Sequence, residues 1–168
     1  YYITSATFSA PFTGDAQVYA SRFVSLACGA LCLVLLWRGV RALWPESPQL
    51  AILATGFAAL WPLHINIGAM ANNDAMAGVF AAWVFERIAQ IASRSQRESV
   101  GWKNSDAIWL GLASGLGLSS KSTSLVLMIV AVGAAFVFAR SRVLTSDEKP
   151  TQSPIFAPLG VLIIALLV

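Results

Sequence analysis

Long stretches without a charged residue limit most strongly what this chain can fold into. Residues 47–73 contain no Asp, Glu, Lys or Arg, and residues 107–139 contain only Lys121. A helix needs about 20 mostly apolar residues to cross the hydrocarbon core of a bilayer. Only 11% of all residues are charged, whereas a soluble domain carries about 25%. These features exclude a soluble domain and a disordered chain, and they predict an all-α, polytopic transmembrane helical bundle.

The apolar stretches predict five to six spans in a single, partial transmembrane domain over residues 1–168. Neither end of the chain resembles a natural terminus, so we expect an internal part of a larger membrane protein. We expect an outer segment at residues 1–17, followed by spans at about residues 18–37, 49–67, 74–92, 107–119, 122–139 and 158–168.

The stretch around Lys121 is too long for one straight span. A single helix of its 33 residues would be roughly 50 Å long at about 1.5 Å a residue, and the hydrocarbon core is about 30 Å thick. A break at residues 119–122 divides it into two shorter helices, and it leaves only Arg22 and Lys121 as basic residues on one side. The positive-inside rule makes the other side cytoplasmic. That side receives nine of the 11 basic residues: Arg38, Arg41, Arg87, Arg94, Arg97, Lys103, Arg140, Arg142 and Lys149.

Asp74 opens the third span on the predicted outer face, directly after Asn72 and Asn73. Asn and Asp side chains cap helix N-termini, and the helix dipole favours an anion there. A carboxylate at the edge of a membrane cavity also binds a cation or a substrate hydroxyl. The two interpretations are compatible, and both stay open at this point.

Lys121 lies between two apolar runs, where an ionisable residue is costly and indicates a functional site. A Lys at a helix end also reaches lipid headgroups without binding a ligand, so this alternative stays open. The hydroxyls and helix-start amides beside Lys121 suit a phosphate. Ser120 replaces the second glycine of the nucleotide-binding P-loop and no strand precedes the segment, so we expect no nucleotide cofactor.

The other polar residues of the apolar stretches give weaker signals. Arg22 lies at the outer end of the first span, where it either reaches the interface or contacts an anionic ligand or a carboxylate. His64 follows a Trp-Pro pair and is more typical of a hydrogen-bonded interfacial residue than of a ligand. Cys28 and Cys32 have no zinc-type spacing, and we expect them to pack as small apolar residues. The net charge of +3 follows from the positive-inside bias, so we expect no nucleic acid partner.

Four short segments resemble, in their order along the chain, the GT-C membrane glycosyltransferases that use a polyprenyl-phosphate-sugar donor. The similarity is to the protein mannosyltransferase and aminoarabinose transferase group, and it covers roughly residues 1–137. Ser119-Ser120 stands where that group often has Leu-Thr, and the group's main catalytic Asp belongs to an outer loop upstream of Tyr1. The four segments are Tyr1-Tyr2 with Ala10-Pro11-Phe12, then residues 20–25 (Ala-Ser-Arg-Phe-Val-Ser), residues 69–75 (Ala-Met-Ala-Asn-Asn-Asp-Ala) and residues 115–122 (Gly-Leu-Gly-Leu-Ser-Ser-Lys-Ser).

The resemblance implies a glycosyltransferase that moves a sugar from a polyprenyl-phosphate carrier to an acceptor of unknown type. It implies that Asp74 is a catalytic carboxylate, which helps to hold a divalent metal ion or to position the substrate. It further implies that Lys121 contacts the lipid-linked phosphate, and that Arg22 and Asn73 bind substrate. This chemistry needs a carboxylate base for the acceptor and cationic groups for the departing phosphate.

The same resemblance implies an integral protein of the bacterial inner membrane, with its active face periplasmic or extracellular. Two other classes stay open from the sequence. A transporter or flippase of a lipid-linked or anionic substrate also uses broken helices beside a central basic residue. A non-catalytic membrane subunit would have no site of its own.

Overall fold

The described part of the chain is built from α-helices and short connections. The computed structural model describes residues 2–71, 73–98, 102–145 and 156–167, and no strand occurs among them. The predicted all-α class is therefore confirmed. The elements are α1 (Tyr2–Ser9), α2 (Asp15–Leu43), α3 (Pro48–Leu60), α4 (Pro62–Ala69), α5 (Asn73–Glu98), α6 (Asn104–Ser120), the 3-10 turn η1 (Ser122–Ser124), α7 (Leu125–Thr145) and α8 (Phe156–Leu167).

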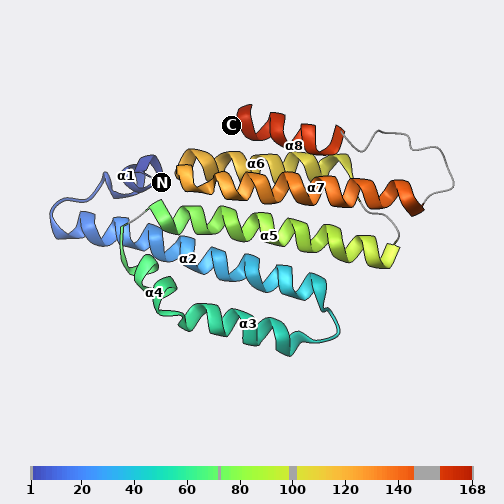
Figure 1. Ribbon diagram of the computed structural model, residues 1–168. Coiled ribbons are helices and arrows are strands. Elements are labelled where there is room, and N and C mark those ends of the chain that lie inside the picture. Colours follow the sequence, from blue (N-terminus) through green and yellow to red (C-terminus); the bar gives the residue numbers. More distant parts are fainter. Residues whose placement is uncertain (1, 72, 99–101, 146–155, 168) are drawn as a thin grey trace.

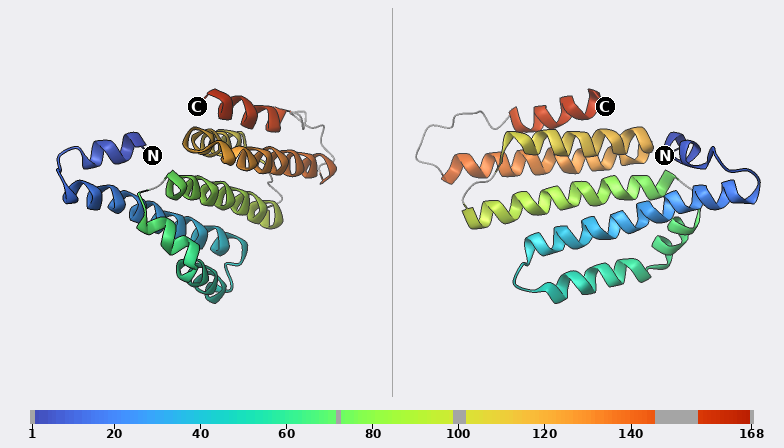
Figure 2. Two further views of the ribbon diagram at one scale, coloured as in Figure 1. Left: turned by 60° about the vertical axis from the view of Figure 1, so that its left-hand side comes forward. Right: turned by 180° about the vertical axis from the view of Figure 1, so that it is seen from behind.

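The helices stack as a row of layers with α5 near its centre (Figures 1 and 2). α2 covers one side of α5, and α3 and α4 lie beyond α2. α6 and α7 cover the other side of α5, and α8 closes the row against both. The main apolar core lies on this second side, between α5, α6, α7 and α8. Its buried members include Val84, Ile91, Leu110, Ala113, Ala131, Ala135 and Val161.

Two helix pairs approach each other closely at glycines. A Cβ atom on Gly111 of α6 would lie 2.6 Å from Cβ of Ile164 and 3.1 Å from the Val161 carbonyl of α8. A Cβ atom on Gly39 of α2 would lie 2.5 Å from the Phe85 ring of α5. Small residues allow this backbone approach in membrane helices, where packing rather than the hydrophobic effect drives association. These two contacts fix the register of α6 on α8 and of α2 on α5.

Within the described residues, α2 and α5 are long and apolar enough to cross a membrane, and α3 with α4 makes a third such element if the bent pair is one span. The stretch that we predicted as one span, residues 49–67, contains a bend of 60° between α3 and α4. Pro62 causes it, because proline lacks the backbone N–H that would continue the helix and its ring clashes with the preceding turn. The prediction of five to six spans stays a prediction.

The predicted break around Lys121 is present. α6 ends at Ser120, η1 follows, and α7 begins at Leu125. Both ribbon views show α6 and α7 running antiparallel beside each other (Figures 1 and 2). The bundle therefore has one end at which α2, α5 and α7 begin, and another at which they finish.

The end at which α2, α5 and α7 finish, here called the basic end, carries most of the basic residues. This distribution agrees with the expected charge bias, although Lys149 lies outside the described residues. Basic residues in the last parts of α2, α5 and α7 and at the start of α6 are Arg38, Arg41, Arg94, Arg97, Lys103, Arg140 and Arg142.

Two buried carboxylates tie the helices together toward the basic end. Asp106 at the start of α6 is 4% exposed. Arg94 of α5 donates to both of its carboxylate oxygens at 2.7 Å, and the backbone N–H of Lys103 donates to Oδ2 at 2.8 Å. Glu86 of α5 is 1% exposed and lies 3.0 Å from the guanidinium of Arg38 on α2. Ion pairs thus link α5 to each of its neighbours α2 and α6.

Candidate functional site

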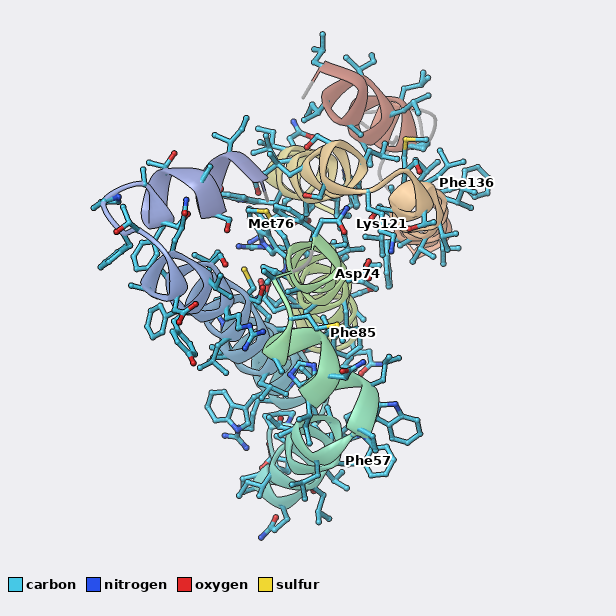
Figure 3. The ribbon with its side chains drawn as sticks, turned by 90° about the vertical axis from the view of Figure 1, so that its left-hand side faces the viewer. Phe57, Asp74, Met76, Phe85, Lys121 and Phe136 are labelled. Atoms are coloured by element: carbon cyan, nitrogen blue, oxygen red, sulfur yellow. The ribbon has the colours of Figure 1, made fainter. Side chains whose placement is uncertain are left out.

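The two main predicted site residues, Asp74 and Lys121, form an ion pair across the bundle. Asp74 lies in the first turn of α5, and Lys121 is the residue directly after α6. They are 47 positions apart, and Nζ of Lys121 contacts Oδ1 of Asp74. Their side chains are 31% and 35% exposed. Figure 3 looks onto the end opposite the basic end and shows both residues between α5 and the turn from α6 to α7.

The chain places Lys121 by ending one helix and starting another. Lys121 has an extended backbone (φ −157°, ψ 129°), so α6 stops there. Its N–H still donates to the Gly117 carbonyl at 3.0 Å, and its carbonyl accepts from the Ser124 N–H at 2.9 Å. The ammonium group is therefore presented from a turn whose backbone is held on both sides. The end of α6 at Ser120 is therefore what gives Lys121 its position.

Asn73 adds a second link between α5 and the end of α6. Its side-chain amide donates to the Ser120 carbonyl at 3.3 Å. The hydroxyls of Ser119 and Ser120 donate to the Leu116 carbonyl at 2.9 and 3.0 Å. In this arrangement Asn73 holds the segment that carries Lys121, so the structure gives it a positioning contact. Asn72 lies outside the described residues.

A small cavity of about 60 Å³ lies behind the ion pair, between α2, α4 and α5. Asp74 and Gly78 line it from α5, Gly29 and Cys32 from α2, and His64 from α4. His64 packs against α2, because its Nε2 lies 3.6 Å from the point where a Cβ atom on Gly29 would be. His64 was not among the predicted site residues. The Trp-Pro pair before it was the available signal, since a helix that bends there turns His64 toward α2.

Arg22 does not join the Asp74–Lys121 pair. α2 and α5 run parallel, and Cys32 Sγ donates to the Gly78 carbonyl at 3.6 Å across 46 positions. At this register Asp74 is level with Cys28 of α2. Arg22 is six residues nearer the start of α2, which is about 9 Å along the helix axis. It lines a separate groove of about 580 Å³ between α2 and α4.

The described residues do not form a metal centre by themselves. They contain no group of three or more His, Cys, Asp or Glu side chains that would surround an ion. Asp74 offers one carboxylate, and the ammonium of Lys121 already contacts it. A divalent cation prefers several oxygen ligands, so this set does not fit it. The metal role of Asp74 stays a prediction, and no step of the chemistry below passes through a metal.

The family model for dolichyl-phosphate-mannose-protein mannosyltransferases matches residues 5–168. Comparison with curated proteins and with solved structures finds no match. The matched range includes Asp74, Lys121 and Arg22, and it confirms the resemblance to GT-C glycosyltransferases. Together with the apolar helices, it identifies an integral membrane protein. The chain therefore belongs to the dolichyl-phosphate-mannose-protein mannosyltransferase family, whose members are glycosyltransferases of the GT-C type.

Proposed function

We propose that the Asp74–Lys121 pair is part of the site at which a sugar leaves a polyprenyl-phosphate carrier and joins an acceptor. The observation that carries this proposal is the convergence of a carboxylate and an ammonium group from α5 and α6 at one end of the bundle. Family membership favours a transferase over a transporter or a non-catalytic subunit. The partly exposed side chains support access by a ligand.

The two groups suit glycosyl transfer, one by stabilising developing charge and the other by positioning a substrate hydroxyl. The acceptor oxygen attacks the anomeric carbon, the bond from that carbon to the phosphate oxygen breaks, and the acceptor proton passes to a base. Negative charge grows on the departing lipid phosphate, and a fixed cation lowers the barrier by stabilising it. We assign to Lys121 the role of the cation that stabilises the departing phosphate. We assign to Asp74 the role of accepting a hydrogen bond from a hydroxyl of the substrate.

The ion pair that exists before substrate binds implies that the donor phosphate binds first and the hydroxyl binds second. An incoming phosphate competes with Asp74 for the single ammonium group of Lys121. When the phosphate takes Lys121, Oδ1 of Asp74 exchanges the ammonium contact for a hydrogen bond from a substrate hydroxyl. Donor binding therefore prepares the carboxylate for the hydroxyl that it has to hold, and Asn73 keeps the Lys121 turn in place meanwhile.

The donor class is tested with the full-length protein in membrane vesicles. Radiolabelled mannose is supplied either on a polyprenyl phosphate or on a nucleoside diphosphate, under conditions that prevent exchange between the two. We expect label to reach acceptor material only from the polyprenyl phosphate, because a lipid-linked phosphate reaches a site among membrane helices laterally. Transfer from the nucleotide donor alone would contradict the proposed donor.

We also propose that the Asp74–Lys121 end faces the periplasm or the exterior, because the basic end is then cytoplasmic. Exposed serines at the two ends of α6 test this orientation. With Cys28 and Cys32 replaced by alanine, we expect Ser119→Cys to react with a membrane-impermeant maleimide in intact cells. Ser105→Cys should react only after permeabilisation. The reverse pattern of labelling would refute the orientation.

A further inference from the structure

The groove that contains Arg22 is a large hollow on the bundle. It has a volume of about 580 Å³ and lies between α2 and α4. Its wall extends along α2 from Tyr19 to Leu33, which is about 21 Å at 1.5 Å a residue. The volume is within the range of about 300–1,000 Å³ that is usual for pockets of small ligands. The bend at Pro62 shapes the groove, because it turns α4 by 60° away from the line of α3.

The wall of the groove is apolar and open to the surroundings of the bundle. Phe23 and Leu26 of α2 are 58% and 59% exposed, and Ile65 of α4 is 55% exposed. Gly68 leaves further room, because a Cβ atom there would meet nothing within 4 Å. Hydrocarbon chains pack well against such a surface in an integral membrane protein. The groove is therefore shaped for a chain that enters from the side.

Arg22 gives this apolar wall a permanent charge near the start of α2. Within the part of the chain that the structure describes, no ion pair or hydrogen bond engages its guanidinium, and the side chain is exposed. A long basic side chain at this end of a span reaches the level of the lipid headgroups, and a guanidinium pairs well with a phosphate. The charge thus calls for an anionic group at the same end of the groove.

We propose that this groove binds an anionic phospholipid of the surrounding bilayer, with a hydrocarbon chain along α2 and the phosphate at Arg22. This groove adjoins the small cavity beside Asp74 but is not lined by the proposed donor-site pair. Neither Asp74 nor Lys121 lines the groove, and Arg22 is displaced from Asp74 by about 9 Å along α2.

The bound lipid would also support the wall behind Asp74. Gly29, His64 and Gly68 line both the groove and the small cavity that Asp74 lines. α4 is a short helix of 8 residues with no fully buried residue. A hydrocarbon chain between α2 and α4 supplies packing contacts that α4 lacks within the described bundle. The lipid is thus a structural ligand of the helix that carries His64.

The test measures lipids retained by the full-length protein in native mass spectrometry, after exchange into micelles that contain matched phosphatidylglycerol and phosphatidylcholine. We expect the wild type to prefer phosphatidylglycerol by about fivefold, the factor that one basic residue contributes at an anionic lipid surface. Arg22→Gln should abolish this preference and Arg22→Lys should keep it. Because Arg22 is exposed, these variants report on binding rather than on folding.

A glycine pair separates groove filling from general damage. Gly68→Leu places a side chain in the groove, where it takes the space of part of the hydrocarbon chain. The lipid then buries less apolar area, and the retention of both lipids should fall by about fivefold or more. Gly56→Leu on α3 is the matched control and should bind lipid as the wild type does. A Cβ atom meets nothing within 4 Å at either position, and only Gly68 lines the groove.

Three results would overturn the proposal. The first is an unchanged lipid preference in Arg22→Gln, and the second is equal retention in the two glycine variants. The third is displacement of phosphatidylglycerol from the wild type by an equal amount of polyprenyl phosphate, which would assign the groove to the donor. Because the readout is lipid retention, it is independent of the sugar-transfer assay and of the proposed function.

Discussion

A Lys121→Met variant of the full-length protein is expected to transfer sugar at least about 100-fold more slowly than the wild type. Removing one preorganised donor of charge stabilisation typically costs about 10²–10³ in kcat, and methionine keeps the length of the side chain without its charge. The measurement is the initial rate of transfer from a polyprenyl-phosphate sugar at saturating donor. Lys103→Met is the matched control, because it makes the same substitution at the other end of α6, and it should retain wild-type rates.

An exchange of the two charges distinguishes catalysis from structure at this pair. If the Asp74–Lys121 contact serves only to hold α5 against the turn after α6, a double variant with Asp74→Lys and Lys121→Asp rebuilds it and should recover activity. If Lys121 meets the phosphate, the double variant stays inactive although it is folded. Recovered transfer would therefore contradict the assigned roles. Wild-type activity in Lys121→Met would contradict them more directly.

An Arg94→Met variant is expected to lose about 3 kcal/mol of unfolding free energy, because the Asp106 carboxylate then stays buried without its partner. Asp106 is 4% exposed, and the two hydrogen bonds from Arg94 are 2.7 Å long. Unfolding of the full-length protein in mixed micelles, followed by circular dichroism, measures the loss. The assay measures unfolding and needs no substrate, and the ion pair lies toward the basic end, away from the candidate site.

Arg97→Met is the control for this second prediction. Arg97 lies three positions further along α5, its side chain is 53% exposed, and it is 3.9 Å from a Glu46 carboxylate that is 91% exposed. Exposed pairs contribute about 0–1 kcal/mol, so the variant should unfold nearly as the wild type does. A further variant with both Arg94→Met and Asp106→Leu should recover part of the lost stability, because it removes the buried charge as well. Equal losses of unfolding free energy in Arg94→Met and Arg97→Met would show that the buried pair contributes no more to stability than the exposed one.

The sequence was sufficient to predict the break at Lys121 because a charge in an apolar stretch is costly wherever it lies. The stretch around it was also too long for one span, and both constraints favoured the same position. The convergence of Asp74 and Lys121 followed from the alternating direction of successive helices. These inferences needed only length, charge and topology.

The position of Arg22 could not be predicted in the same way. Its distance from Asp74 depends on how far α2 is shifted along α5, and that register depends on the close contact of Gly39 with the Phe85 ring. No local pattern specifies which glycine a given ring will meet. The bend at Pro62 was visible as a residue type, but the apolar run around it has the length of one span and was interpreted as one. The groove and the place of His64 were missed with it.

The hairpin of α6 and α7 has a consequence for how the protein is inserted into its membrane. α6 has 17 residues, about 25 Å of helix, so it is shorter than a hydrocarbon core of about 30 Å. In the proposed orientation, biosynthesis must carry the Lys121 turn through that core, where insertion scales assign a lysine a cost of about 2.5–3.5 kcal/mol. α5 leaves the ribosome first and brings Asp74 with it. Asp74 therefore precedes Lys121 in synthesis, and it is the carboxylate that the Lys121 ammonium contacts once the hairpin of α6 and α7 is in place.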